Sequence, residues 1–343
     1  MVSIKDIAKE VGVTPATVSM ALNGKGSISL RTVEQIKEVA QRMHYVPHKA
    51  AKALKTHKSY TIGMIVGSIR NPYFQPVIAA VGEVATEHGY ALVLSDARAD
   101  KDMAYNALQN LQSMGVDGIV ISLGFYVDQR FSDKILELIA SGIKVVSFTL
   151  SVKGSGWPLV EQVEDACIEE IVQAISNSNH HRVTLISSRI GTWLDEQRGE
   201  KMREALIRNG IDPIILHSGI TIHEAEETAY AFLSEHKETE MIMAINDEVA
   251  MGVMFAARKL GIRIPQELSL AGFDGSSFTR LTTPTITTVL VPLREIGTKG
   301  TELLIHNIIN NTNSQEQIFI PCSLQEGESF RMTIEGDKKR CMC

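Results

Sequence analysis

The sequence predicts two fold classes in one chain: an all-α helix-turn-helix headpiece and an α/β core of two lobes with parallel sheets. Apolar residues recur at helical spacing over residues 3–43, and from residue 61 onward short β-branched runs alternate with helical stretches. Residues 1–58 contain ten Lys and Arg against four Asp and Glu, a net charge of +6. The whole chain is −6, so residues 59–343 carry −12. A basic head on an acidic body is typical of a phosphate-binding module joined to a sensor domain.

Three short amphipathic helices are expected in the headpiece. A glycine turn at Gly12 follows the first helix, and Thr14 and Pro15 suit the N-cap and first position of the second. The three apolar stripes are Ile4, Ile7, Ala8 and Val11; Val18, Ala21 and Leu22; and Val33, Ile36, Ala40 and Met43. Two short helices joined at a glycine and braced by a third form the helix-turn-helix arrangement. A small basic domain that binds protein, or nothing, is the alternative.

The core is expected to contain two series of alternating strands and helices. The first series has strands at 61–67, 90–95, 118–123 and 143–148 and helices over 72–88, 102–114 and 128–141. The second has strands at 182–187, 213–216, 240–245, 268–272 and 286–291 and helices over 166–178, 193–209, 222–236 and 247–260. Two such series predict two Rossmann-like lobes with a cleft at the carboxyl ends of their strands. The helix over 293–310 is expected to return to the first lobe.

Four segments follow from these patterns. They are a headpiece over 1–46, a hinge helix and linker over 47–60, a core over 61–330 and a disordered tail over 331–343. The hinge segment has a helical composition but is too short to be stable alone in water.

Several function classes are excluded by what the sequence lacks. No segment approaches the ~18 continuous apolar residues of a membrane span, and no export signal is present, so a cytoplasmic protein is expected. Cys167, Cys322, Cys341 and Cys343 have no zinc-site spacing, and His180-His181 is interpreted as a solvated turn, so neither a metal nor a cofactor is expected. No nucleophile elbow, Walker loop or H-E-x-x-H motif is present, which disfavours an enzyme.

Seven segments together resemble the lactose-repressor family of bacterial transcription regulators, and the likeness runs from Ser3 to about Phe330. They are IKDIAKEVGVTPATVSMALNG (4–24), HYVPHKAAKALK (44–55), NPYF (71–74), GVDGIVI (115–121), AINDEVAMGV (244–253), GIRIPQELSLAGFD (261–274) and TPTITTV (283–289). The resemblance implies a homodimer that binds a pseudo-palindromic double-stranded DNA operator. It also implies a core like the periplasmic sugar-binding proteins, which binds a small-molecule effector between its lobes.

The second helix is the candidate reader of base edges. Pro15, Ala16 and Met20 on its exposed face are nearly all apolar, which favours contacts with thymine methyl groups over bonds to guanine. Thr14, at the start of this helix, is also a candidate. Candidates for phosphate contacts are Thr17, Ser19 and Asn23. Ordinary surface polarity is the alternative for Thr17 and Ser19, and a core contact is the alternative for Met20.

Four hinge residues are DNA-binding candidates through the resemblance. It implies that Leu54 of each subunit inserts into the minor groove at the operator centre, where an apolar wedge unstacks a base step and bends the duplex. Lys49, Lys52 and Lys55 would neutralise flanking phosphates. The alternative is that Leu54 packs on the core.

Six residues are candidates for effector binding. Asp274 ends a buried strand, where a carboxylate can accept hydrogen bonds in the cleft or hold a turn beside Gly275. The resemblance implies that Asp274 and Arg198 contact the effector, and a surface charge is the alternative for Arg198. The other four candidates are Tyr73 and Phe74, with core packing as the alternative to stacking, and Asn246 and Asp247 after another strand, where a helix N-cap is the alternative for Asp247.

The expected function is therefore a sequence-specific transcription repressor whose operator binding is controlled allosterically by a sugar or related metabolite. A regulator that needs a partner protein for DNA binding is a rival, and operator binding by the purified dimer alone would separate the two. A solute-binding protein for a transporter is disfavoured by the DNA head and the lack of an export signal. An enzyme is disfavoured by the lack of a nucleophile and base.

Overall fold

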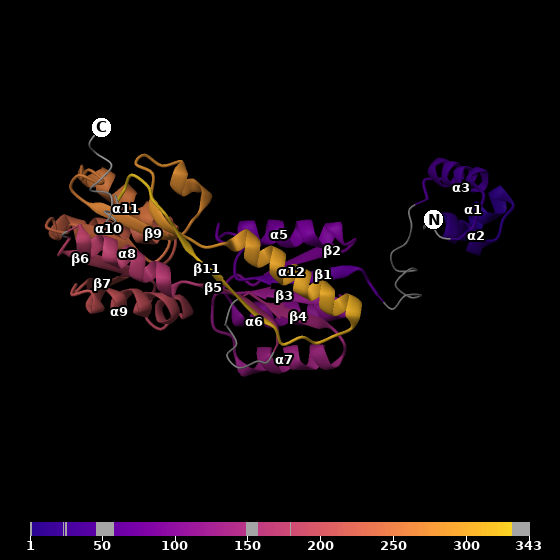
Figure 1. Ribbon diagram of the computed structural model, residues 1–343, viewed down its shortest axis with the longest axis horizontal. Helices are drawn as coiled ribbons and strands as arrows, with labels where there is room; N and C mark the ends of the chain where they lie inside the picture. The colour runs from indigo at the N-terminus through magenta and orange to yellow at the C-terminus, as the bar shows by residue number, and fades with distance from the viewer. Residues whose placement is uncertain are drawn as a thin grey trace, which may run out of the picture. The chain divides into compact units, whose positions relative to one another are not determined.

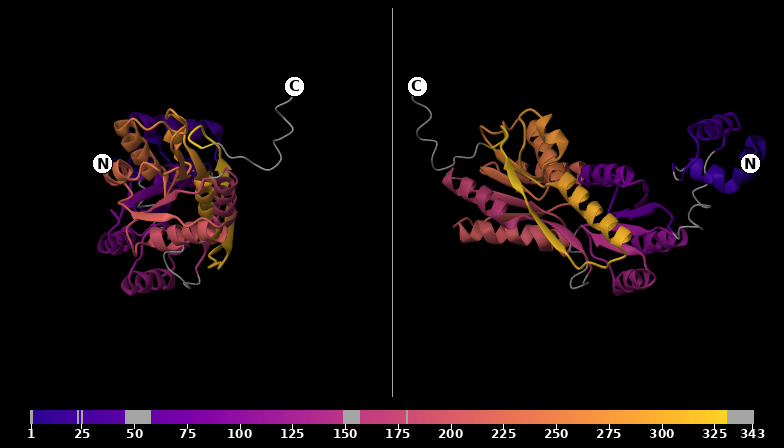
Figure 2. Two further views of the ribbon diagram at one scale, coloured as in Figure 1. Left: turned by 90° about the vertical axis from the view of Figure 1, so that its left-hand side faces the viewer. Right: turned by 45° about the vertical axis from the view of Figure 1, so that its right-hand side comes forward.

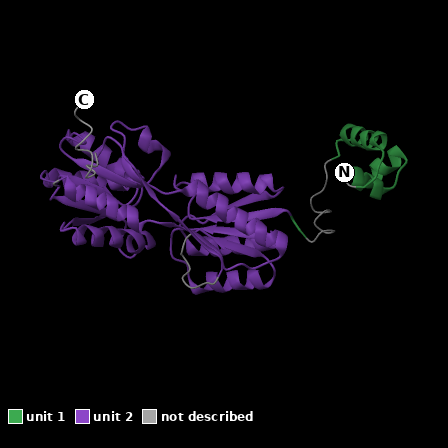
Figure 3. Ribbon diagram, viewed as in Figure 1, with its two compact units in different colours: residues 1–59 green, residues 60–343 purple. Residues whose placement is uncertain are grey.

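The computed structural model describes residues 2–22, 24, 26–45, 58–148, 157–178 and 180–330. The chain divides into two compact units, Met1–Ser59 and Tyr60–Cys343 (Figure 3). Each unit has its own hydrophobic core.

Unit 1 is a three-helix domain built around a small apolar core. Helices α1 (Ile4–Val11), α2 (Pro15–Leu22) and α3 (Leu30–Arg42) bury Ile7, Val18 and Ile36 completely. Gly12 has a φ of 74°, a left-handed conformation that suits glycine at a helix end. The predicted helices and their buried stripes are confirmed.

Hydroxyl side chains cap helices α2 and α3 of unit 1. The Thr14 hydroxyl accepts a hydrogen bond from the Thr17 amide (3.1 Å), so α2 begins with the predicted N-cap before Pro15. Ser29 does the same for α3 through the Thr32 amide (3.2 Å). These bonds satisfy amides that the first turn of a helix leaves without a backbone partner.

Unit 2 contains two α/β lobes, which Figures 1 and 2 show as two layered bodies. Lobe 1 has a six-stranded parallel sheet in the order β11-β5-β4-β3-β1-β2. Its strands are β1 (Thr61–Val66), β2 (Ala91–Asp96), β3 (Gly118–Ser122), β4 (Lys144–Ser147), β5 (Leu159–Val163) and β11 (Gln317–Pro321). Helix α5 (Phe74–Glu87) packs beside α12 (Leu293–Asn310), and α6 (Lys101–Ser113) packs beside α7 (Gln129–Ala140) on the other face (Figure 1).

Lobe 2 repeats the plan, with one antiparallel edge strand. The order is β12-β10-β9-β8-β6-β7, and β12 runs antiparallel to β10. The strands are β6 (Val183–Ser187), β7 (Ile214–His217), β8 (Met241–Ala244), β9 (Ser269–Asp274), β10 (Thr287–Leu290) and β12 (Ser323–Gln325). The helices are α8 (Asp165–Asn177), α9 (Glu200–Arg208), α10 (Ile222–Glu235) and α11 (Asp247–Leu260), with a π-helical turn η1 (Asp195–Gly199) and a 3-10 turn η2 (Ser277–Arg280).

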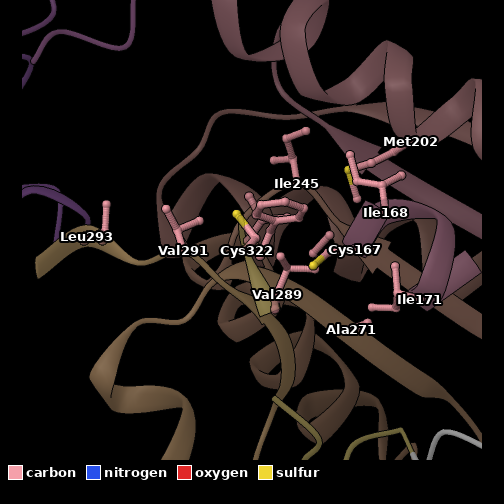
Figure 4. Close-up of a cluster of buried hydrophobic side chains, with 14 of the residues drawn as sticks. Cys167, Ile168, Ile171, Met202, Ile245, Ala271, Val289, Val291, Leu293 and Cys322 are labelled. Atoms are coloured by element: carbon pink, nitrogen blue, oxygen red, sulfur yellow. The ribbon is translucent and has the colours of Figure 1, made fainter. Parts of the chain in front are cut away.

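The chain crosses between the lobes three times, at residue 164, at residues 291–292 and at residue 322. Helix α12 therefore belongs to lobe 1, as predicted. Figure 4 shows Val291 and Cys322, from two of these crossovers, in a buried apolar cluster with Cys167, Ile245 and Val289. The crossovers are fastened to neighbouring strands, because the Cys322 amide donates to the Val163 carbonyl (3.1 Å) and the Val291 amide donates to the Asp274 carbonyl (3.2 Å).

The predicted core strands and helices are present within one or two residues of their expected ends, but four features differ. Strands β5 and β12 were not predicted, because their sequences mix polar with apolar residues. Strand β11 was not predicted, because its apolar run is only three residues long and lies between polar residues and a proline. The single helix expected over 193–209 is divided, and its first part is the π-helical turn η1. Among the described residues, no helix is both long enough and apolar enough to span a bilayer.

Candidate functional site

A cavity of about 570 Å³ lies between the lobes, at the carboxyl ends of their parallel strands. Loops after β1 and β3 form its lobe 1 side, and loops after β6, β7, β8 and β9 form its lobe 2 side. Parallel α/β sheets commonly bind ligands at this end of their strands. Five of the six candidate effector residues line this cavity: Tyr73, Phe74, Arg198, Asn246 and Asp274.

The lobe 1 wall is largely aromatic. The rings of Tyr73 and Phe74 meet edge to face with centroids 5.2 Å apart, and Phe125 lies on the same wall. Gly67 permits this packing, because a Cβ there would lie 2.9 Å from the Phe74 ring and 2.0 Å from the Leu123 carbonyl. Tyr73 and Phe74 therefore pack together and also face the cavity, so both interpretations made from the sequence describe them. Burial raises the pKa of Tyr73 above its ordinary value.

Arg198 is the central charged group of the cavity, and only 4% of its surface is exposed. Its Nη1 donates to Asp274 Oδ1 (2.8 Å) and to the Ile245 carbonyl (3.0 Å). Its Nη2 and Nε donate to the two carboxylate oxygens of Glu164 (2.7 and 3.2 Å). The guanidinium also lies over the Phe273 ring, 3.8 Å from its centroid. The surface-charge alternative for Arg198 is therefore wrong.

The π-helical turn η1 carries Arg198 to this position. Gly199 packs so closely on β6 that a Cβ would lie 2.3 Å from the Ser187 hydroxyl oxygen. That hydroxyl donates to Asp195 Oδ1 (2.5 Å), which fixes the start of the turn. Short π-helical insertions occur preferentially at functional sites.

Asp274 ends β9 in an unusual backbone conformation. Its φ is 107°, in the region that non-glycine residues rarely adopt, and 6% of its surface is exposed. Burial raises its pKa to about 6, against the opposing effect of the Arg198 guanidinium. The residue both faces the cavity and precedes the turn at Gly275, so neither sequence interpretation excludes the other.

Asn246 and Asp247 have different roles. The Asn246 side chain accepts from the Val249 amide (2.8 Å), so Asn246 is the N-cap of α11, and the residue also lines the cavity. Asp247 is fully buried and is not part of the cavity lining among the described residues. Its two carboxyl oxygens accept from the Thr288 hydroxyl and from the Ser276 amide (both 2.6 Å), so Asp247 braces the loop after Asp274. Asp247 is therefore neither the N-cap nor placed for effector contact, which corrects both readings of this residue.

Several site residues were missed by sequence reasoning. Glu164, the bidentate partner of Arg198, lies on the first crossover, after a strand that was not predicted. Glu164 is not itself part of the cavity lining among the described residues; the missed residues that do line the cavity are Gln162, Phe125, Trp193 and Glu248. Burial and the nearby Asp274 raise the pKa of Glu248 to about 7. An acidic residue next to a predicted helix start was the available signal for Glu164, but nothing in the sequence connected it with a residue 34 positions away.

A side-chain hydrogen bond joins the two lobes beside the cavity. Tyr126, from the loop after β3 in lobe 1, donates its hydroxyl to Glu196 of η1 in lobe 2. Glu196 and Arg198 belong to the same π-helical turn, so this turn contacts both the cavity interior and the opposite lobe.

The described DNA-binding candidates lie on α2 as expected. Thr14, Pro15 and Ala16 are exposed, Thr17 and Ser19 are half-buried, and Met20 is 41% exposed, which is more than a core contact would leave. The hydroxyls of Thr14 and Thr17 are also hydrogen-bonded to each other (2.9 Å). The remaining candidates lie outside the described residues: Asn23, Lys49, Lys52, Leu54 and Lys55.

Metal ligands do not cluster in the part of the chain that the structure describes, where no group of three or more His, Cys, Asp or Glu is arranged to hold an ion. His180 is partly buried, with its Nε2 3.0 Å from the Ser269 hydroxyl and its ring edge to face with Phe330. The expectation of a solvated turn is therefore wrong for His180, while His181 is exposed.

Both parts of the chain match known families. A profile described as bacterial regulatory proteins, lacI family, matches residues 3–48. A profile described as periplasmic binding proteins and sugar binding domain of LacI family matches residues 59–328.

Similar proteins cover nearly the whole chain. The ribose operon repressor of Halalkalibacterium halodurans is 29% identical over 96% of this chain and 98% of its own length. Catabolite control protein A of Priestia megaterium is 25% identical over 96% and 99%. A lac repressor dimer bound to operator and the anti-inducer ONPF has the same fold, with a TM-score of 0.84 at 20% identity over 96% and 98% of the two chains. A LacI family regulator from Enterococcus faecium with bound ribose has a TM-score of 0.70 at 20% identity, covering 80% of this chain and all of its own.

Proposed function

Because the chain belongs to the LacI family of bacterial regulatory proteins, we propose that it is a cytoplasmic homodimeric repressor whose operator affinity is set by a sugar-like effector in the cavity between the lobes. It is a DNA-binding transcription regulator and not an enzyme. The observation that carries the effector assignment is the position of Arg198, Asn246 and Asp274. All three line one cavity: Arg198 from the turn η1, Asn246 from the residues after β8 and Asp274 from the end of β9.

The DNA-binding end of the proposal rests on α2. Its N-terminal face exposes Pro15, Ala16 and Met20, which are small or apolar and suit contact with thymine methyl groups in the major groove. Thr14, Thr17 and Ser19 would contact the flanking phosphates, together with Asn23. Two such helices in a dimer would read the two halves of a pseudo-palindromic site.

The hinge residues would complete the contact with DNA. In this proposal Leu54 of each subunit enters the minor groove at the operator centre, and Lys49, Lys52 and Lys55 neutralise the phosphates beside it. Replacing Leu54 with alanine is expected to weaken operator binding while effector affinity stays the same. Unchanged operator affinity would refute the wedge.

Effector binding would act through a shift in the relative orientation of the lobes. The turn η1 supports this proposal, because its Arg198 faces the effector cavity and its Glu196 bonds to Tyr126 of lobe 1. An effector that favours one orientation shifts the population of the dimer toward the state with high or low operator affinity.

The decisive experiment is a footprinting survey of fragments of the source genome with the purified full-length protein. We expect protected pseudo-palindromic sites whose occupancy changes when the right metabolite is added. Binding should weaken steeply with salt, since phosphate contacts release counterions. If no fragment is protected with any candidate metabolite, the proposal fails. If protection requires a second protein from the same cells, the chain is a regulator that depends on a partner.

A further inference from the structure

The Arg198 guanidinium has little capacity left for a ligand. An arginine has five N–H donors, and four of them are already used, by Glu164, by Asp274 and by the Ile245 carbonyl. Glu164 takes two of these donors in a bidentate pair. A carboxylate or phosphate on the ligand would have to displace one of these buried partners to gain a comparable pair.

The groups around Arg198 instead offer hydrogen-bond acceptors. The buried Oε1 of Gln162, a residue of the cavity lining, has no hydrogen-bond partner among the described residues. The Gln162 amide nitrogen donates to Glu164 (3.3 Å), which places the oxygen as the free end of the side chain. A buried acceptor without a partner favours a ligand that brings a donor.

The charged residues at the interior end of the cavity, which is the part around Arg198 and Asp274, also disfavour an anionic ligand. Glu164 and Asp274 both pair with the single Arg198 guanidinium. Glu248 is a third carboxyl group, which lines the cavity near Asp274 and forms no ion pair with a cation among the described residues. The other arginines of the lining are Arg189, which pairs with Glu224, and the exposed Arg70. The interior end of the cavity is therefore acidic overall.

From these contacts, and building on the proposed function, we infer that Glu164 determines ligand specificity. By occupying Arg198 it makes the interior end of the cavity select a neutral polyol or an amino sugar and reject sugar acids and sugar phosphates. The hydroxyl and ammonium groups of such a ligand would donate hydrogen bonds to Gln162, Asp274 and Glu248. An added anion would face carboxylates with no free guanidinium to receive it.

The test is calorimetric titration of the full-length protein with matched sugars. The panel is glucose, glucosamine, glucuronate and glucose 6-phosphate, together with galactose, galactosamine, galacturonate, ribose and ribose 5-phosphate. We expect binding only among the neutral and amino members. Binding of an acid or phosphate at least as tight as that of its neutral counterpart would overturn the inference, and so would binding by no member of the panel.

Two variants and one control locate the effect. Glu164→Gln keeps an oxygen for the Arg198 Nε but removes one charge, so the affinity of the matching sugar acid should rise by about tenfold. Glu248→Gln leaves the Arg198 cluster intact and should give a smaller rise, about threefold. Asp165→Asn removes the neighbouring charge from an exposed pair with Lys201 and should leave all affinities unchanged.

Thermal unfolding and operator binding of each variant show whether it is folded. If folded Glu164→Gln binds acids no better than the unmodified protein, Glu164 does not set specificity. If Glu164→Gln does not fold, Glu248→Gln decides, and the absence of any gain for acids in that variant refutes the acidic-end argument. Operator protection that responds to a sugar acid would overturn this inference while leaving the proposed function intact.

Discussion

The two lobes of the core share a strand order but contribute different chemistry to the cavity between them. Lobe 1 supplies an aromatic wall, with Tyr73, Phe74 and Phe125. The buried charged groups at the interior end of the cavity, Arg198 and Asp274, belong to lobe 2, and Glu164 lies on the crossover that leads into it. A repeated architecture therefore carries a divided site, in which lobe 2 holds the buried charges and lobe 1 supplies the aromatic pair Tyr73 and Phe74 together with the uncharged acceptor Gln162.

The largest expected effect comes from removing the cation of lobe 2. Arg198→Ala would leave Glu164 and Asp274 buried without their counter-charge, so the free energy of unfolding should fall by about 3–5 kcal/mol. Urea unfolding followed by circular dichroism measures this. Arg203→Ala, which removes an exposed pair with Glu200, is the control and should cost less than about 1 kcal/mol. An equal loss of unfolding free energy in the two variants would show that the buried ion pairs of Arg198 contribute no more to stability than an exposed pair.

The next effect is a pH dependence that belongs to lobe 2. Burial raises the pKa of Asp247 to about 8, from an ordinary value of 3.8. The folded protein then keeps a proton that the unfolded chain has already released, so the free energy of unfolding should fall as pH rises from about 4 to 8. Glu248 and Asp274, whose pKa values are raised to about 7 and about 6, act in the same direction.

Asp247→Asn tests this directly. The amide oxygen can still accept from the Ser276 amide, and the amide NH2 group can donate to the Thr288 hydroxyl in place of the second carboxyl oxygen. The side chain carries no titrating proton, so the fall in the free energy of unfolding with pH should shrink by an amount on the order of a few kcal/mol. Urea unfolding at pH 5, 6, 7 and 8 provides the measurement. Asp165→Asn, an exposed site, should retain the full decline. Identical slopes for Asp247→Asn and the unmodified protein would contradict the raised pKa.

A smaller effect is expected at the bond that joins the lobes. Tyr126→Phe removes the hydroxyl that donates to Glu196, and one such bond contributes about 1 kcal/mol, so effector affinity should fall about fivefold. Calorimetric titration with the effector measures the change. Tyr105→Phe alters a lobe 1 tyrosine whose ring lies under Arg130, so it should leave the affinity unchanged. If Tyr126→Phe also leaves the affinity unchanged, effector binding does not depend on this bond.

The smallest effect is expected on the lobe 1 wall. The Tyr73 hydroxyl has no hydrogen bond among the described residues, and the ring packs on Phe74. Tyr73→Phe keeps the ring, so effector affinity should change less than about twofold. A tenfold loss in calorimetric titration would show that the hydroxyl contacts the ligand. The division between a polar lobe and an aromatic lobe would then not hold.

Local patterns in the sequence predicted most of the fold. The glycine turn, the Thr14 cap and the apolar stripes are local features, and they gave the headpiece its three helices. Apolar runs likewise predicted β1 and β9, and the end of β9 placed Asp274 at the cavity. Strands β5 and β12 were not predicted, because one mixes polar with apolar residues and the other is too short to show a strand pattern.

The site was less predictable than the fold. Arg198 and Asp274 were named, but the partner that neutralises Arg198 was not, because Glu164 is brought to it by a crossover between lobes. Asp247 was wrongly assigned to effector contact or the N-cap. Asn246 and Asp247 both follow β8 directly, and only the packing of the folded chain decides which side chain is buried behind the cavity. Contacts between distant segments depend on topology, and a single sequence does not display them.

The three crossovers also determine when each lobe can finish folding during synthesis of the chain. Lobe 1 is completed by α12 and β11, which follow the whole of β6–β10 along the chain. A nascent chain that has left the ribosome only as far as Leu290 contains four lobe 2 helices but still lacks one covering helix and one edge strand of lobe 1. Neither lobe is a continuous segment, so the two must finish folding together after synthesis has passed β12. A translation product that stops short of α12 would expose the apolar face of the lobe 1 sheet that this helix covers.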